Sequence, residues 1–154
     1  MSHPAPSIEV AKLIRITRAA RHAGNVKRED GRWLDLMTPH ALQIVLEVAQ
    51  RPGINMKQLG AAAGLAHASI SRNLMALGER HRRDMPGLGL IETIDDPQEY
   101  RRKVAFLTRK GRTFVSELVS IQLGEKVTLS APTAVEFLSG WGGDDRSTLS
   151  KSMS

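Results

Sequence analysis

The stretch NMKQLGAAAGLAHASISRNLMAL, residues 55–77, contains two short helical segments separated by a glycine. Asn55 is a residue that caps helices, and the alanine-rich segment after it closes at Gly64. The second segment is expected to run from about His67 to Leu77. Two short helices joined by a turn of about three to four residues that contains glycine are typical of a helix-turn-helix. The stretch therefore predicts this motif, although many simple corners between helices share the pattern.

The second helix of the motif has one face suited to contact with DNA. On a helical wheel, Ile70, Leu74 and Leu77 share one side. The opposite side carries small, uncharged or basic residues: Ala68, Ser71, Arg72 and Met75. Arginine bonds guanine through two hydrogen bonds, serine reaches bases or phosphates, and alanine or methionine touches thymine methyls. Residues 71–76 contain no acidic side chain, unlike most solvent-facing helices. We therefore expect Ser69, Ser71 and Arg72 to contact bases or phosphates, with His67 at the helix start near a phosphate.

A predicted β-hairpin follows this helix. Residues 90–94 and 103–107 are expected to form its strands, and residues 95–99 its turn. Arg101 and Arg102 lie at or near the tip. A basic hairpin tip next to a helix-turn-helix indicates a wing that reaches an adjacent groove or the phosphates.

Start and stop signals predict the remaining elements. Three helices are expected: one from the Ser7 cap to Gly24-Asn25, one from Thr38-Pro39 to Arg51-Pro52-Gly53, and one from the Thr108 cap to Gly124. Residues 33–37 form an apolar segment of uncertain type. Residues 126–129 are a possible strand, residues 130–138 could form a short helix, and a disordered tail is expected from residue 140.

The run DPQEYRRKVAFLTRKG, residues 96–111, resembles the wing of the MarR (multiple antibiotic resistance regulator) family. Glu99 and Arg101 match that family's acidic-x-Arg pair, and the closing Leu-Thr-x-x-Gly motif is also present, as Leu107, Thr108 and Gly111. Further matches lie in the helix-turn-helix: Leu59, Ala63, Gly64, Leu65, Ser69, Ile70, Ser71, Arg72 and Leu74. The resemblance covers residues 38–115.

This resemblance implies a mainly α fold with a small β wing, a winged helix-turn-helix flanked by N- and C-terminal helices for dimerisation. It also implies that Arg101 enters the minor groove and that Glu99 orients it. Three features depart from the family: Glu99 stands where aspartate is usual, extra residues lie around 81–89, and the C-terminal part is short and interrupted by Gly124 and Pro132. The arginines of the extra segment, Arg82 and Arg83, either contact phosphates or belong to a solvated loop.

The expected organisation has four parts. Residues 1–37 hold the N-terminal helix and a connector for dimerisation, and residues 38–108 form the DNA-binding domain. Residues 109–139 form a C-terminal helical region, and residues 140–154 form the tail. Dimerisation is expected to use parts of the last helices together with the apolar face of the first helix. That face carries Ile8, Val10, Leu13 and Ile14.

The composition and motifs exclude several kinds of functional site. The 154 residues contain no cysteine, which excludes disulfides, thiolate metal sites and thiol-based redox sensing. The five histidines lack metal-ligand spacing, and no nucleophile-elbow, phosphate-loop or dinucleotide motif is present. No secretory signal or membrane span is visible, so we expect a cytoplasmic, non-enzymatic protein without metal or cofactor. The net charge of +6 favours an anionic partner.

The leading hypothesis is a sequence-specific double-stranded DNA-binding transcriptional regulator, most simply a repressor, whose homodimer reads an inverted repeat. One alternative is a DNA-binding accessory protein for replication, partition or nucleoid organisation. Another is a winged-helix protein-interaction module that binds an acidic partner. A small-molecule effector in the dimer crevice is possible by analogy with the family, although no polar cluster in the sequence identifies it.

Overall fold

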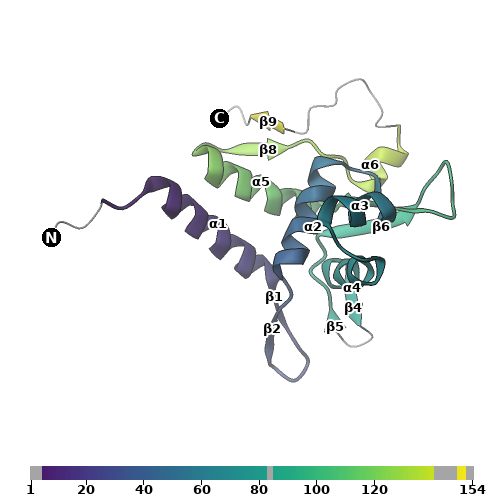
Figure 1. The fold of residues 1–154 in the computed structure, drawn as a ribbon, viewed down its shortest axis with the longest axis horizontal. Coiled ribbons are helices and arrows are strands. Elements are labelled where there is room, and N and C mark those ends of the chain that lie inside the picture. The colour runs from purple at the N-terminus through teal and green to yellow at the C-terminus, as the bar shows by residue number, and fades with distance from the viewer. Residues whose placement is uncertain (1–4, 83–84, 141–148, 152–154) are drawn as a thin grey trace.

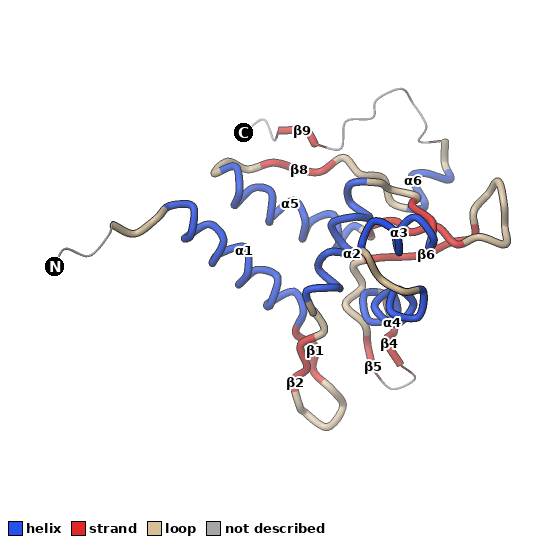
Figure 2. The backbone as a smooth tube through the Cα atoms, viewed as in Figure 1, coloured by secondary structure: helices blue, strands red, loops and turns tan. Residues whose placement is uncertain are grey.

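The computed structural model describes residues 5–82, 85–140 and 149–151. Within these residues the fold is mainly helical, with small antiparallel sheets (Figures 1 and 2). The helices are α1 (Ile8–Gly24), α2 (Pro39–Gln50), α3 (Met56–Ala63), α4 (His67–Leu77), α5 (Arg109–Leu123) and α6 (Ala134–Leu138). The strands are β1 (Asn25–Lys27), β2 (Trp33–Asp35), β3 (Ile54–Asn55), β4 (Arg80–Arg82), β5 (Met85–Pro86), β6 (Ile91–Asp95), β7 (Lys103–Leu107), β8 (Val127–Leu129) and β9 (Leu149–Lys151). The predicted fold class, mainly α with a small β wing, is confirmed.

Side-chain caps fix the starts of the predicted helices. Ser7, Thr38 and Thr108 accept hydrogen bonds from the first turns of α1, α2 and α5. Asn55 and Gln58 form a reciprocal capping box at the start of α3. These bonds satisfy amide groups that have no partner inside a helix, which is why the local sequence located the helix starts correctly.

Helix α2 lies at the centre of the core and contacts α3, α4, α5 and β7. Ala41, Ile44, Val45 and Val48 are fully buried, as expected for a helix that is apolar on more than one side. Leu46, on the same helix, is 41% exposed. The elements around α2 leave that side of the helix uncovered.

The predicted wing hairpin is confirmed as β6 and β7, and β3, which was not predicted, extends it to a three-stranded antiparallel sheet of order β3-β7-β6. Strands β6 and β7 pair from Ile91↔Leu107 to Asp95↔Lys103. Ala105 and Leu107 face the main core, whereas Val104 and Phe106 lie on the other face in a separate buried cluster. The wing therefore has two covered faces.

Two further hairpins are present. Strands β1 and β2 form one between α1 and α2, so the apolar segment of uncertain type begins as a strand. Strands β4 and β5 form the other, within the extra segment after α4. Backbone bonds anchor its base to the end of α4: Leu88 N donates to Ala76 O at 2.9 Å, and Gly89 N donates to Gly78 O at 2.8 Å. This hairpin projects from the C-terminal end of α4 (Figure 1).

The C-terminal segment runs back along α5 after the turn at Gly124. The possible strand at residues 126–129 is confirmed as β8, and the short helix is confined to α6, since residues 130–133 are not helical. Within the expected disordered tail, residues 149–151 form β9, because their backbone pairs with β8. Residues 141–148 and 152–154 lie outside the described residues.

Two absences hold for the described ranges. None of the helices there combines the length and the apolar character needed to cross a membrane. Those ranges also contain no group of three or more histidine, aspartate and glutamate side chains able to hold a metal ion.

Candidate nucleic-acid interface

Helix α4 presents the face that its sequence predicted. Ile70 and Leu77 are fully buried against the core, and Leu74 is half-buried. The opposite side is exposed and carries no acidic group: Ala68, Ser71, Arg72 and Met75. The exposed face is therefore narrow, uncharged except for one guanidinium, and free of side chains that would repel phosphates.

Polar groups along α4 restrain part of this face. Asn73 Nδ2 donates to Ser69 O at 2.8 Å, within the helix, and Thr38 Oγ1 donates to Asn73 Oδ1 at 3.4 Å. Arg72 Nη2 donates to Ser69 Oγ at 3.4 Å, a long contact on the exposed surface. Arg72 remains exposed and is held only by this long contact among the described residues, so its guanidinium is available to a ligand.

The wing tip differs from the expected arrangement. Glu99 Oε2 accepts from Arg102 Nη2 at 2.9 Å, and Arg102 Nε lies 3.5 Å from Asp96 Oδ2. Glu99 thus holds Arg102, and the expectation that it orients Arg101 is wrong for this structure. The reason is local: Arg102 N donates to Glu99 O at 2.9 Å, and this turn brings residues three apart together.

Arg101 is exposed at the wing tip and has no hydrogen bond or ion pair to any described residue. Lys103, two positions later, is paired with Asp95 at 2.6 Å. Of the three successive cations at residues 101–103, only Arg101 therefore keeps its charge unpaired within the described part of the chain. It is the wing residue best placed to bind a phosphate or enter a groove.

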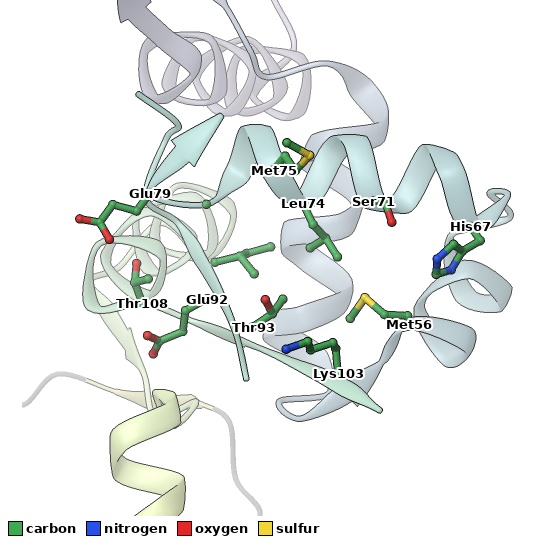
Figure 3. Close-up of a pocket in the computed structure, with 12 residues that line it drawn as sticks. Met56, His67, Ser71, Leu74, Met75, Glu79, Glu92, Thr93, Lys103 and Thr108 are labelled. Carbon is green, nitrogen blue, oxygen red and sulfur yellow. The ribbon is translucent and has the colours of Figure 1, made fainter. Parts of the chain in front are cut away.

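Two hollows lie beside these elements. One separates α4 from the wing strands and is lined by Ser71, Leu74 and Met75 on one wall and Thr93 and Lys103 on the other (Figure 3). The second lies between α3 and the wing, and its lining includes His67 and four cationic side chains: Lys57, Arg101, Arg102 and Lys103. A phosphate strand that passes from α4 to the wing would meet this second hollow.

Lys57 is a residue that the sequence analysis missed. It is exposed near the start of α3, where backbone amides and a cationic side chain both favour an anion. Its place two residues after the cap Asn55 is a signal that the sequence contained. Its closeness to the wing depends on the tertiary fold and had no local signal.

The other predicted site residues are placed as follows. His67 is exposed at the first position of α4. Arg82 belongs to β4, whereas Arg83 lies outside the described residues. The four apolar residues proposed for dimerisation are all exposed on α1: Ile8 at 73%, Val10 at 53%, Leu13 at 61% and Ile14 at 48%. The second half of α1 packs on α5, and the first half extends away from the core (Figure 1).

A helix-turn-helix whose second helix lies beside an antiparallel hairpin defines a winged helix-turn-helix protein. No family model and no curated protein matches this chain. Solved structures do match it, and they are described as transcription regulators. A MarR family transcription regulator is 21% identical with a TM-score of 0.52, S. aureus MepR bound to DNA is 18% identical with 0.55, and a Thermotoga maritima transcriptional regulator is 14% identical with 0.53.

The matches cover most of this chain but less of some neighbours. The match to the MarR family regulator covers 75% of this chain and 64% of that protein. The match to MepR covers 75% and 79%, and the match to the Thermotoga maritima regulator covers 76% and 66%. The chain therefore spans less than two thirds of the length of two of them. At these identities the likeness shows the fold, which is the MarR-like winged helix that the wing motif predicted.

Proposed function

We propose that this protein is a sequence-specific double-stranded DNA-binding regulator of transcription, without catalytic activity, that represses by occupying an inverted repeat. The observation that carries this proposal is the acid-free exposed face of α4 beside a wing whose Arg101 is unpaired among the described residues. The fold it shares with S. aureus MepR, which was solved in complex with DNA, supports the proposal. We infer that such a regulator would act in the cytoplasm.

In this proposal α4 enters the major groove and the wing reaches the neighbouring minor groove. Ser69, Ser71 and Arg72 contact bases or phosphates, and His67 lies near a phosphate. Arg101 reaches the minor groove or its edge, while Glu99 and Arg102 stiffen the tip through their ion pair. Lys57 contacts the strand between the grooves.

Dimerisation completes the proposed regulator. A helix with four large apolar side chains exposed along its first half needs a partner, and a second copy of the same helix supplies a matching surface. Residues 1–37 then serve dimerisation and residues 38–108 bind DNA. Two copies related by a twofold axis read half-sites about one helical turn apart. A small-molecule effector would fit between the terminal helices and the DNA-binding lobe.

Selection of bound duplexes from a random pool tests the proposal. We expect enrichment of one palindromic sequence, together with binding that weakens by about 0.9 in log affinity per log salt for each phosphate contacted. Enrichment of many weak unrelated sites would instead indicate an organiser of the nucleoid. No enrichment, or no salt dependence, would contradict DNA binding and favour an acidic protein partner.

Arg72→Ala tests the placement of the recognition helix. Loss of a guanidinium that bonds a base is expected to cost about 1–3 kcal/mol on the preferred duplex and to relax base preference at one position. Titration of the preferred duplex and of single-base variants measures both effects. Arg109→Ala, at the start of α5, removes the same charge as a control. Unchanged affinity for preferred and scrambled duplexes would show that α4 is not the reading element.

Arg101→Ala and Glu99→Gln test the wing tip together. Arg101→Ala is expected to weaken specific binding by about tenfold and to reduce the salt slope by about 0.9, because one phosphate or groove contact is lost. Glu99→Gln is expected to have a much smaller effect, since Glu99 holds Arg102 and not Arg101. A larger loss in Glu99→Gln than in Arg101→Ala would mean that Glu99 orients Arg101 when DNA is bound.

A further inference from the structure

The outer face of the wing sheet is covered by the C-terminal segment. Val104 and Phe106 of β7 form a buried cluster with Ala134, and Ile94 of β6 packs against it. Phe106 is fully buried although it points away from the main core. We name residues 131–138, which provide this cover, the brace. Its helix α6 contacts β6 and β7.

Polar contacts hold the brace on the sheet. Ala134 N, at the start of α6, donates to Glu92 Oε1 of β6 at 3.1 Å. Glu92 stands directly opposite Phe106 in the strand register, so this bond and the buried ring lie on the same face. The brace therefore contacts both strands of the wing.

An aromatic contact adds to this attachment. The rings of Phe106 and Phe137 have centroids 5.0 Å apart and are tilted by 41°. That distance lies within the range in which aromatic pairs attract each other beyond simple burial. Phe137 is 38% exposed. It therefore lies between the buried Phe106 ring and the solvent.

The other end of the brace is fixed to α5. Arg112 Nη1 donates to Glu136 Oε2 at 3.1 Å and to Ala131 O at 3.2 Å. The hydrogen bond from Arg112 lowers the pKa of Glu136, so this ion pair is formed at neutral pH. Just before the brace, Leu129 N donates to Ser116 Oγ of α5 at 2.9 Å. The segment therefore connects α5 to the wing by side chains on both elements.

We propose that the brace holds the wing in the orientation from which Arg101 reaches DNA, and that Glu92 and Phe137 are positioning residues for DNA binding. This inference rests on the proposed function. A two-stranded hairpin alone is marginally stable, and β3 supports only the β7 edge and the base of the wing. The brace covers the outer face of β6 and β7, where Ile94, Val104 and Phe106 would otherwise be exposed to water.

Phe137→Ala is the main variant, and Val135→Ala is its matched control. Val135 lies on the same short helix but is 69% exposed, so its loss should leave the sheet covered. Amide exchange of the wing strands in the free protein is expected to become at least about threefold faster in Phe137→Ala. Affinity for the preferred duplex is expected to fall by about tenfold, close to the effect of Arg101→Ala.

A double-mutant cycle separates positioning from general stability. If the brace acts through Arg101, then Arg101→Ala should cost about tenfold in the native background but less than about twofold in Phe137→Ala. Phe137→Leu, which keeps an apolar cover, should restore most of the affinity. Full additivity of the two changes would overturn the proposal.

Variants of Glu92 test the brace independently if Phe137→Ala does not fold. Glu92→Gln keeps an oxygen that accepts from Ala134 N and should behave as the native protein, whereas Glu92→Leu should loosen the wing and weaken binding. Wing exchange and affinity unchanged in both Phe137→Ala and Glu92→Leu would contradict the brace while leaving the proposed function standing. Failure of the native protein to bind any duplex would instead contradict the proposed function.

Discussion

Leu13→Asp is expected to convert the protein from a dimer to a monomer and to weaken binding to a two-half-site duplex by at least about a hundredfold. Leu13 is 61% exposed in the first half of α1, between the other exposed apolar residues of that helix. A carboxylate placed there would have to be buried without a partner when two copies associate, which is strongly unfavourable. Each monomer would then bind its half-site alone and lose the gain from two linked contacts.

Sedimentation of the free protein and titration of the palindromic duplex measure these two effects. Val135→Asp is the matched control, because it places the same charge on another exposed apolar residue, on α6 and not on α1. The control should sediment as the native protein does. A Leu13→Asp variant that remains dimeric, or a native protein that is already monomeric, would show that α1 is not the dimer interface.

Gly111→Ala is expected to destabilise the fold by about 3 kcal/mol or more. A methyl group on Gly111 would overlap the carbonyl oxygen of Leu90, because the first turn of α5 lies directly against that peptide group. The same peptide accepts from Thr108 N at 2.9 Å, and Thr108 Oγ1 donates to Gly89 O at 2.6 Å. Backbone atoms form this contact, so no side-chain rearrangement can make room.

Urea denaturation of Gly111→Ala and Thr113→Ala measures the effect. Thr113 is exposed on the same helix, and its replacement should change stability by less than about 0.5 kcal/mol. An equal midpoint for the two variants would contradict the close approach at Gly111. The contact also explains the Leu-Thr-x-x-Gly motif: Leu107 enters the core, Thr108 caps α5, and Gly111 lets the helix meet the strand.

The parts of the fold that local chemistry controls could be predicted from the sequence. Thr108 marks a helix start through a hydrogen bond three residues away, and Ile70 and Leu77 define the buried side of α4 through helical periodicity alone. The wing strands were predicted because two apolar segments flank a turn rich in charge and proline. These signals all act within a few residues.

The contacts that could not be predicted from the sequence connect residues far apart in the chain or depend on the geometry of a turn. Phe137 packs on Phe106, and nothing near either residue indicates the pairing. At the wing tip, the resemblance to the MarR family implied that Glu99 orients Arg101, but the turn pairs Glu99 with Arg102. Lys57 joins the candidate interface only because α3 lies beside the wing.

The short β4–β5 hairpin is attached to the end of α4 through peptide groups, as Leu88 N and Gly89 N donate to carbonyl oxygens of that helix and the glycine after it. The base of the hairpin is also constrained by its side chains, because a Cβ on Gly87 would overlap Gly78 O and Leu88 is buried in the core. Changes of length and composition are therefore expected to leave α4 undisturbed only where they spare residues 87–89. The rest of the hairpin is a candidate site for a fluorescent reporter, which would lie close to the proposed DNA-binding face.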